Sequence, residues 1–279
     1  MTTAGSTTAG SKMWWRHLAG LGAAAILMLA GCASAYRAAL DNLEATKPAS
    51  LSGWTTAEID GQNAEDWLWD RSAIIVGGAE DFTAVFNPDR TRMQRTSLGD
   101  EKADAGSAVA VTPDGYFLTA AHCVEKAPLW IVLRTEDNQP QRYPARVVWV
   151  GDESSGGPDL ALIHIDASTP KYLEIHDDPF VPKQVLCCGS GIGSLRWCAG
   201  RGVSVGGGIY RGVPCTVTVH TSPVSLGDSG GPAVDAAGVF IGVNIEVEVQ
   251  LDGTDAHATA IRPGSQWLRD RIAEDRTKH

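Results

Sequence analysis

Three short stretches carry residues whose types could together cleave an acyl bond. Residues 225–234 read SLGDSGGPAV and place Ser229 among glycines, while His122 follows the run YFLTAA and Asp159 precedes the run LALIHI. A serine hydroxyl becomes a good nucleophile when a neighbouring imidazole accepts its proton, and a carboxylate can hold that imidazole in the required tautomer. We therefore expect Ser229 as nucleophile, His122 as base and Asp159 as the orienting group.

The segments around these residues are predicted to be mostly β-strands. From residue 106 the chain alternates short β-branched runs with turns, as in GSAVAV, the turn TPDG and then YFLTAAHCV. Proline fixes φ in such a turn and glycine tolerates positive φ. One convincing helix is expected, at residues 265–276, where Ser265 can cap QWLRDRIAEDR. These patterns indicate an all-β protein with a C-terminal α-helix.

The strings TAAHCV, DLALI and GDSGGP, in this order, resemble the trypsin/chymotrypsin superfamily of serine proteases over about residues 73–275. Neighbouring residues resemble the bacterial, HtrA-type branch, although no segment for its PDZ domain follows the helix. The resemblance implies a chymotrypsin-like double six-stranded β-barrel, with barrel one at about residues 73–166 and barrel two at about 180–262. It also implies a serine endopeptidase that acts on protein or peptide substrates through an acyl-enzyme, without a cofactor or a metal.

The resemblance assigns roles to further residues of this sequence. His122 would serve as base and then acid, and the N–H groups of Gly227 and Ser229 would bind the oxyanion. The substrate pocket would comprise Pro223, Val224, Ser225, Leu226 and Asn244. Trypsin has aspartate six residues before its nucleophile, where this chain has Pro223. We therefore expect an apolar or small pocket and the least preference for cleavage after Arg or Lys.

Two other functions are compatible with the same motifs. One is a catalytically silent or regulated binding protein on this fold, which a fluorophosphonate probe would distinguish, and the other is an esterase-like hydrolase. GDSGG also matches the nucleophile elbow of α/β-hydrolases, but that fold needs its acid and histidine after the serine. Only 50 residues follow Ser229, without alternating helices, so this fold is excluded.

The N-terminal residues indicate export. Lys12 and Arg16 precede the uncharged run 18–30, which is too short to cross a bilayer as a helix and fits a signal peptide. The string LAGC that ends at Cys32 resembles a bacterial lipobox, in which the cysteine is acylated. We therefore expect a signal peptide at residues 1–31, a lipid-anchored tether at 32–72 and the protease domain at 73–279. The protein would lie in the cell envelope, bound to a bacterial membrane.

Charge and aromatic residues add two observations. The net charge of −10 argues against nucleic acid as a partner, because a nucleic-acid binder needs a basic surface. Trp54, Trp67 and Trp69 argue against a fully disordered tether, since large aromatic side chains usually cover a surface.

The cysteines beyond Cys32 are odd in number, so at least one thiol is unpaired. They are Cys123, Cys187, Cys188, Cys198 and Cys215. In animal trypsins the cysteine after the catalytic histidine pairs with one about sixteen residues upstream, where this chain has Ser107, so the resemblance implies that Cys123 is free and buried. A disulfide between Cys198 and either Cys187 or Cys188 is compatible with an oxidising compartment. No spacing typical of a zinc site is present.

The string IIVGG at residues 74–78 has two interpretations. It is either a buried strand followed by a Gly-Gly turn or, as in animal relatives, a new N-terminus whose amine pairs with the aspartate before the nucleophile, here Asp228. The sequence leaves open whether cleavage near Ile75 is needed for activity.

Overall fold

The computed structural model describes residues 58–59, 62–86, 93–98, 104–135, 139–190, 196–249 and 256–279. All of them belong to one compact unit, Thr55–His279. The predicted signal peptide, Cys32 and most of the predicted tether lie outside the described residues. No helix within the described ranges has the length and apolar character needed to span a membrane.

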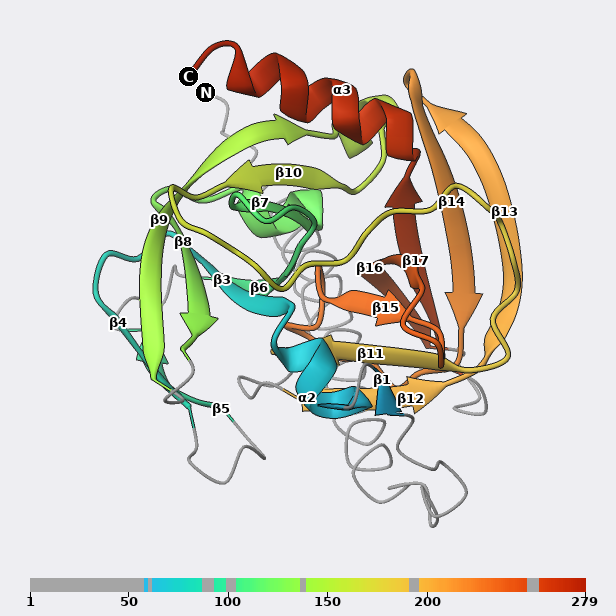
Figure 1. Ribbon diagram of the computed structural model, residues 1–279, viewed down its shortest axis with the longest axis horizontal. Helices are drawn as coiled ribbons and strands as arrows, with labels where there is room; N and C mark the ends of the chain where they lie inside the picture. The colour runs from blue at the N-terminus through green and yellow to red at the C-terminus, as the bar shows by residue number, and fades with distance from the viewer. Residues whose placement is uncertain are drawn as a thin grey trace, which may run out of the picture. The chain divides into compact units, whose positions relative to one another are not determined.

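The first sheet is a closed six-stranded barrel, ordered β10-β7-β6-β3-β8-β9 (Figure 1). Its strands are β3 Ser72–Gly77, β6 Asp104–Ala110, β7 Tyr116–Thr119, β8 Leu129–Arg134, β9 Pro140–Val150 and β10 Ala161–His164. Because side chains alternate between the two faces of a strand, one set from each strand fills the barrel. Ile75, Phe117, Ile131 and Ile163 are fully buried in this core.

The second sheet has seven strands, ordered β12-β11-β15-β16-β17-β14-β13. They are β11 Val185–Gly189, β12 Arg196–Gly200, β13 Gly202–Tyr210, β14 Val213–His220, β15 Pro232–Val234, β16 Phe240–Val249 and β17 Ala256–Pro263. Arg201 alone separates β12, which pairs with β11, from β13, which pairs with β14. The two edges of the sheet are therefore successive parts of one bent segment, and the sheet curls on itself. The second barrel was expected to have six strands, and the structure has seven here because this segment is divided at Arg201.

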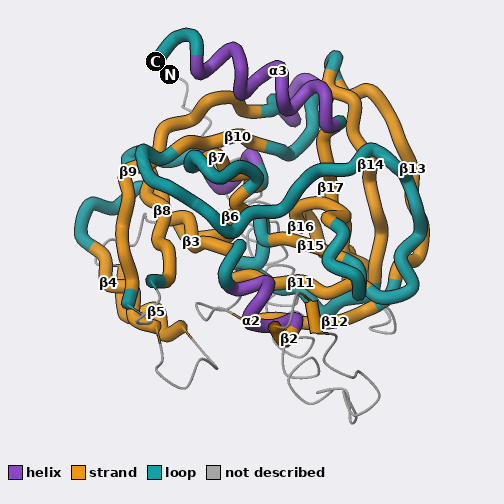
Figure 2. The backbone as a smooth tube through the Cα atoms, in the orientation of Figure 1, coloured by secondary structure: helices purple, strands orange, loops and turns teal. Residues whose placement is uncertain are grey.

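Strands make up most of the described chain, and the C-terminal helix α3 spans Ser265–Arg276 (Figure 2). This confirms the predicted fold class. The predicted cap is wrong in its chemistry, because Gly264 is the N-cap residue and Ser265 lies within the first turn. Asp177 accepts hydrogen bonds from the Ser265 N–H at 2.6 Å and from its hydroxyl at 2.5 Å. A carboxylate from outside the helix thus satisfies its first turn.

Buried polar contacts fix α3 beside β9 of barrel one. The Asp275 carboxylate accepts hydrogen bonds from Arg146 at 2.6 and 2.5 Å and from the Tyr116 hydroxyl at 2.8 Å. These charge-assisted bonds lower the pKa of Asp275 to about 2. Burial, followed by the bond to Asp275, raises the pKa of Tyr116 to about 12.

A short helix, α2 at Ala64–Trp69, precedes the first barrel strand. The other short elements are β1 Glu58–Ile59, β2 Gln62–Asn63, β4 Phe82–Phe86, β5 Met93–Leu98, η2 Ala121–Val124 and η3 Glu153–Ser155. Trp67, Leu68 and Trp69 are buried, and the Arg71 guanidinium lies 3.8 Å from the centre of the Trp67 ring. The compact unit therefore includes α2, on the N-terminal side of the boundary expected at residue 73.

The string IIVGG forms part of barrel strand β3. Ile75 is fully buried and pairs with Gly106 of β6 on one side and with Ile131 of β8 on the other. Cleavage before Ile75 would cut a strand in the middle of a closed barrel. Of the two interpretations, the structure supports the buried strand.

Candidate active site

The pairing of β7 with β10 brings His122 and Asp159 together. Thr119 at the end of β7 is the register partner of Ala161 at the start of β10, so η2 with His122 begins where Asp159 precedes β10. Asp159 is 7% exposed, and its two oxygens accept hydrogen bonds from the His122 Nδ1 at 2.7 Å and from the His122 backbone N–H at 3.1 Å. The carboxylate therefore holds both the ring and its backbone.

Electrostatics around this pair favour a positive imidazole. The hydrogen bond to Asp159 raises the pKa of His122 well above its usual 6.5, and this outweighs the opposing effect of partial burial. Nearby Glu153 has a raised pKa, because burial first and the negative charge of Asp159 second disfavour its ionised form. Since Asp159 occupies Nδ1, the other ring nitrogen, Nε2, is left for a substrate or a nucleophile.

Ser229 lies in a tight segment, residues 225–231, which we call the nucleophile turn. Gly227 and Gly230 adopt φ values of 93° and 82°, which favour glycine. The Ser107 N–H donates to the Ser229 carbonyl at 2.8 Å, and the Cys123 thiol donates to the same oxygen at 3.6 Å. Because Cys123 follows His122 directly, these bonds place the backbone of Ser229 beside the imidazole.

Two buried serines that sequence reasoning did not identify as site residues hold the nucleophile turn. The Gly227 carbonyl accepts hydrogen bonds from the Ser107 hydroxyl at 2.7 Å and from the Ser190 hydroxyl at 3.0 Å. The Ser190 N–H in turn donates to the Ser107 hydroxyl at 2.7 Å. Ser107 comes from β6 and Ser190 follows β11, so the pair joins the two barrels at the turn. No local signal marks either residue.

The Ser229 backbone contacts Cys123, the residue after His122, but the Ser229 hydroxyl and the His122 ring are not joined. Across the described residues, no hydrogen bond links the Ser229 hydroxyl to the His122 ring, a contact that often tightens when substrate binds. The N–H groups of Gly227 and Ser229 have no acceptor within the same described ranges. Two backbone donors beside a hydroxyl can bind a developing oxyanion.

The predicted pocket residues differ in their surroundings. Val224 packs in the core of barrel two and Leu226 is exposed, whereas the Ser225 N–H donates to the Asp228 carboxylate at 2.8 Å. Asn244 is buried, and its amide donates to the Gly231 carbonyl at 3.1 Å. Only part of this set can therefore contact a substrate directly, and its role in specificity stays a prediction.

No disulfide joins any two of the five described cysteines in the structure. Cys123 is half-buried, not buried as expected, because it packs against the outside of the core cluster of barrel one and is not a member of it. Cys187 of β11 faces Cys198 of β12 as its register partner, whereas Cys188 faces Trp197. Among the described residues, no three His, Cys, Asp or Glu side chains cluster as metal ligands would.

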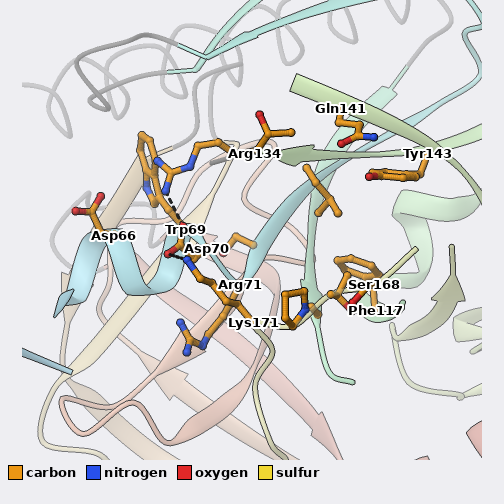
Figure 3. A pocket seen from close by; sticks show the side chains of 16 residues that line it. Asp66, Trp69, Asp70, Arg71, Phe117, Arg134, Gln141, Tyr143, Ser168 and Lys171 are labelled. Atoms are coloured by element: carbon orange, nitrogen blue, oxygen red, sulfur yellow. Dashed lines mark hydrogen bonds and ion pairs between the residues drawn. The ribbon is translucent and has the colours of Figure 1, made fainter. Parts of the chain in front are cut away.

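A separate pocket of about 580 Å³ lies beside α2 and the C-terminal end of β8 (Figure 3). Phe117 and Tyr143 from the barrel interior line it together with Trp69. Asp70 accepts bonds from Arg134 at 2.8 Å and Lys171 at 2.6 Å at its edge. The pocket lining includes neither His122, nor Asp159, nor any residue of the nucleophile turn, so this pocket is distinct from the candidate active site.

Comparisons with known proteins agree with this geometry. Residues 106–243 match the trypsin-like peptidase domain family. A probable periplasmic serine endoprotease, DegP-like, from Marinomonas sp. is 27% identical over 177 residues, which cover 62% of this chain and 36% of the relative. The magnetosome formation protease MamE from Paramagnetospirillum magneticum is 28% identical over 174 residues, which cover 60% of this chain and 23% of that protein. The chain thus spans little more than a third, or less, of these relatives.

Solved structures share the fold. The active form of the Rv3671c protease from M. tuberculosis superposes with a TM-score of 0.51 at 20% identity, over 74% of this chain and 81% of that one. The HtrA-type protease AlgW with tripeptide gives a TM-score of 0.53 at 20% identity, over 73% and 60%. The fold is therefore chymotrypsin-like. The match of residues 106–243 to the trypsin-like peptidase domain family and the named serine endoproteases among the relatives support a serine peptidase.

Proposed function

We propose that this chain is an exported serine endopeptidase that hydrolyses peptide bonds through an acyl-enzyme. The observation that carries the proposal is the pairing of the Asp159 carboxylate with His122 Nδ1 at 2.7 Å, beside the turn that holds Ser229. This pairing leaves Nε2 of the ring on the side where the nucleophile can deliver its proton.

Each step assigns a proton to a named atom. His122 Nε2 accepts the Ser229 hydroxyl proton as the oxygen attacks the scissile carbonyl, and the N–H groups of Gly227 and Ser229 stabilise the oxyanion. The imidazolium then donates its proton to the leaving amine, which breaks the C–N bond and leaves an acyl-serine. Water attacks this ester with His122 again as base, which releases the acid product and restores the serine.

Substrate choice follows from the residues before the nucleophile. We propose an apolar or small side chain at the cleavage site, because Pro223 occupies the position where a basic-selective pocket would need a carboxylate. Asp228 carries the nearest negative charge in the nucleophile turn, but it is buried and accepts the Ser225 N–H. Its charge is thus directed into the protein and not toward a substrate.

The location follows from the N-terminal sequence. The basic residues, the apolar run 18–30 and LAGC support export to the cell envelope and lipid attachment at Cys32. The DegP-like relatives are named as periplasmic, which agrees with export. In an oxidising compartment we further propose a Cys187–Cys198 disulfide, because these two residues are register partners.

One observation favours a regulated form of the same enzyme. Within the described residues the Ser229 hydroxyl is not hydrogen-bonded to His122, so a small rearrangement must complete the triad. A peptide-binding protein that cleaves slowly or only after a conformational change is therefore the second candidate.

The test is hydrolysis of a fluorogenic peptide library by the wild-type protein and by Ser229→Ala. The proposal predicts turnover by the wild type, concentrated on peptides with small or apolar residues at the cleaved bond, and none by the variant. Equal binding of peptides by both proteins without cleavage would favour the second candidate. Preference for Arg or Lys at the cleaved bond would refute the proposed pocket.

A further inference from the structure

A buried polar network lies under the nucleophile turn. Asn244 of β16 is 2% exposed and contacts both residues that follow Ser229. Its carbonyl accepts the Gly230 N–H at 2.7 Å, and its own N–H donates to the Gly231 carbonyl at 2.9 Å. The Asn244 side-chain amide adds a second donor to the Gly231 carbonyl at 3.1 Å. One residue thus makes three hydrogen bonds to the C-terminal half of the turn.

His220 at the end of β14 determines how the Asn244 amide is oriented. His220 is fully buried, and its Nδ1 accepts the Ser222 backbone N–H at 3.3 Å. A neutral imidazole that accepts at Nδ1 carries its proton on Nε2. Nε2 lies 3.2 Å from the Asn244 Oδ1, so the ring donates to that oxygen. Burial lowers the pKa of His220 to about 4, which keeps the ring neutral near pH 7.

The alternative orientation of the amide is unfavourable. The Cys187 thiol also donates to the Asn244 Oδ1, at 3.6 Å. If the amide were rotated by 180°, its NH₂ group would face the His220 Nε2–H, and the Gly231 carbonyl would face an oxygen. A buried polar group without a partner costs about 1–3 kcal/mol. His220 therefore selects the orientation that directs the amide N–H toward Gly231, whether Cys187 is a thiol or part of a disulfide.

We infer that His220 is a positioning residue, which acts through Asn244 to fix the Gly231 carbonyl and so the backbone that carries the Ser229 hydroxyl. Ser107 and Ser190 hold the other half of the nucleophile turn, through the Gly227 carbonyl and the Ser229 carbonyl. The inference rests on the proposed function, because it concerns the nucleophile of that reaction. Displacement of a reacting group by about 1 Å can cost about a hundredfold in rate.

Variants of the two residues separate hydrogen bonding from packing. His220→Gln keeps one donor and one acceptor, whereas His220→Leu removes both and retains an apolar volume. Asn244→Asp keeps the acceptor for His220 but replaces the donor to Gly231 with an oxygen. His164→Leu is the matched control, because His164 ends β10 at the far end of barrel one, where its Nε2 contacts the Asp114 carbonyl at 3.1 Å.

The readouts are the rate of acylation by a fluorophosphonate probe, kcat and KM on a peptide substrate, and the melting temperature of each variant. We expect His220→Leu and Asn244→Asp to lose at least about tenfold in acylation rate and kcat, with KM within about twofold. His220→Gln should retain at least a third of the wild-type rate, and His164→Leu should be unchanged. If His220→Leu fails to fold, the acylation rates of Asn244→Asp and His220→Gln test the inference in its place. Lower melting temperatures with wild-type acylation rates would overturn the inference.

A measurement that does not depend on activity distinguishes this inference from the proposed function. Nitrogen-15 NMR of the His220 ring should show a proton on Nε2 and none on Nδ1 at pH 7. The opposite tautomer would overturn the network whatever the activity. A wild-type protein that shows the expected tautomer but does not react with the fluorophosphonate probe would instead refute the proposed function, and with it the positioning role of His220 in that reaction.

Discussion

The substitution Asp159→Asn tests how the His122 ring is used. In the wild type, one Asp159 oxygen accepts the Nδ1–H and the other accepts the His122 backbone N–H. The asparagine oxygen can keep one of these bonds, but its NH₂ group must then face the other donor. If the NH₂ faces Nδ1, that nitrogen has to become an acceptor, and the ring proton moves to Nε2. The ring can then no longer accept the proton of Ser229.

The size of this effect follows from the change of tautomer. We expect kcat to fall roughly 10⁴-fold, as in a triad whose aspartate is replaced by asparagine. This corresponds to about 5.5 kcal/mol in the activation barrier at about 1.36 kcal/mol per tenfold change. The folded structure should persist, because the replacement preserves size and at least one hydrogen bond.

The pH dependence adds a second readout. In the wild type the rate should rise with pH as His122 loses its proton, with a midpoint above 6.5, because Asp159 raises the pKa of His122. Asp159→Asn removes the charge that stabilises the imidazolium, so the midpoint of the residual activity should move to lower pH.

The assay is kcat and kcat/KM on a peptide amide from pH 5 to 10, with intact fold checked by circular dichroism. Asp166→Asn is the matched control, because fully exposed Asp166 lies 3.6 Å from His164 in a second His–Asp pair of the same barrel. A variant at residue 159 that keeps more than a tenth of wild-type kcat, or a midpoint that moves to higher pH, would refute the reasoning.

Four further predictions concern stability, the nucleophile turn and the cysteines. Asp275→Asn should lower the free energy of unfolding by roughly 2 kcal/mol in urea, because it removes a buried carboxylate that accepts hydrogen bonds from half-buried Arg146 and from Tyr116. The free energy of unfolding of the wild type should fall by about 2 kcal/mol as the pH falls from about 4 to 2. The reason is that the pKa of Asp275 is about 2 in the folded protein and about 3.8 in the unfolded chain. A free energy of unfolding that does not change over this pH range would contradict the prediction. Gly230→Ala should lower the free energy of unfolding by at least about 2 kcal/mol and abolish acylation, because φ of residue 230 is 82° and the added Cβ would meet neighbouring backbone. A variant that reacts with the probe at the wild-type rate would refute this strain. Protein purified from an oxidising compartment should be 2 Da lighter than its reduced form through a Cys187–Cys198 bond; a bond that includes Cys188 would contradict the register.

The parts of the site that sequence could predict are those marked by local motifs. TAAHCV, DLALI and GDSGGP each combine a strand with the residue that follows or precedes it, so the positions of His122 and Asp159 follow once two strands pair. The antiparallel partners Thr119 and Ala161 bring them together. The C-terminal helix was equally visible, because its apolar residues have helical spacing.

Other features depend on contacts between distant segments and leave no local pattern. Ser107 and Ser190 are 83 positions apart, and their hydroxyls meet only after the two barrels pack together. No local pattern marks His220, because its partner Asn244 lies on another strand of the second sheet. The cap of α3 was misassigned for the same reason, since a serine at the helix start is a common cap, while Asp177 is 88 residues away.

The most direct test of the central claim is fluorophosphonate labelling of the purified protein, followed by intact mass and peptide mapping. The account predicts one adduct per chain, located on Ser229, and none on Ser229→Ala. Labelling should slow strongly in His122→Ala, where no base is present. An adduct on another serine, or no adduct on folded wild-type protein, would contradict the assignment of Ser229 as nucleophile.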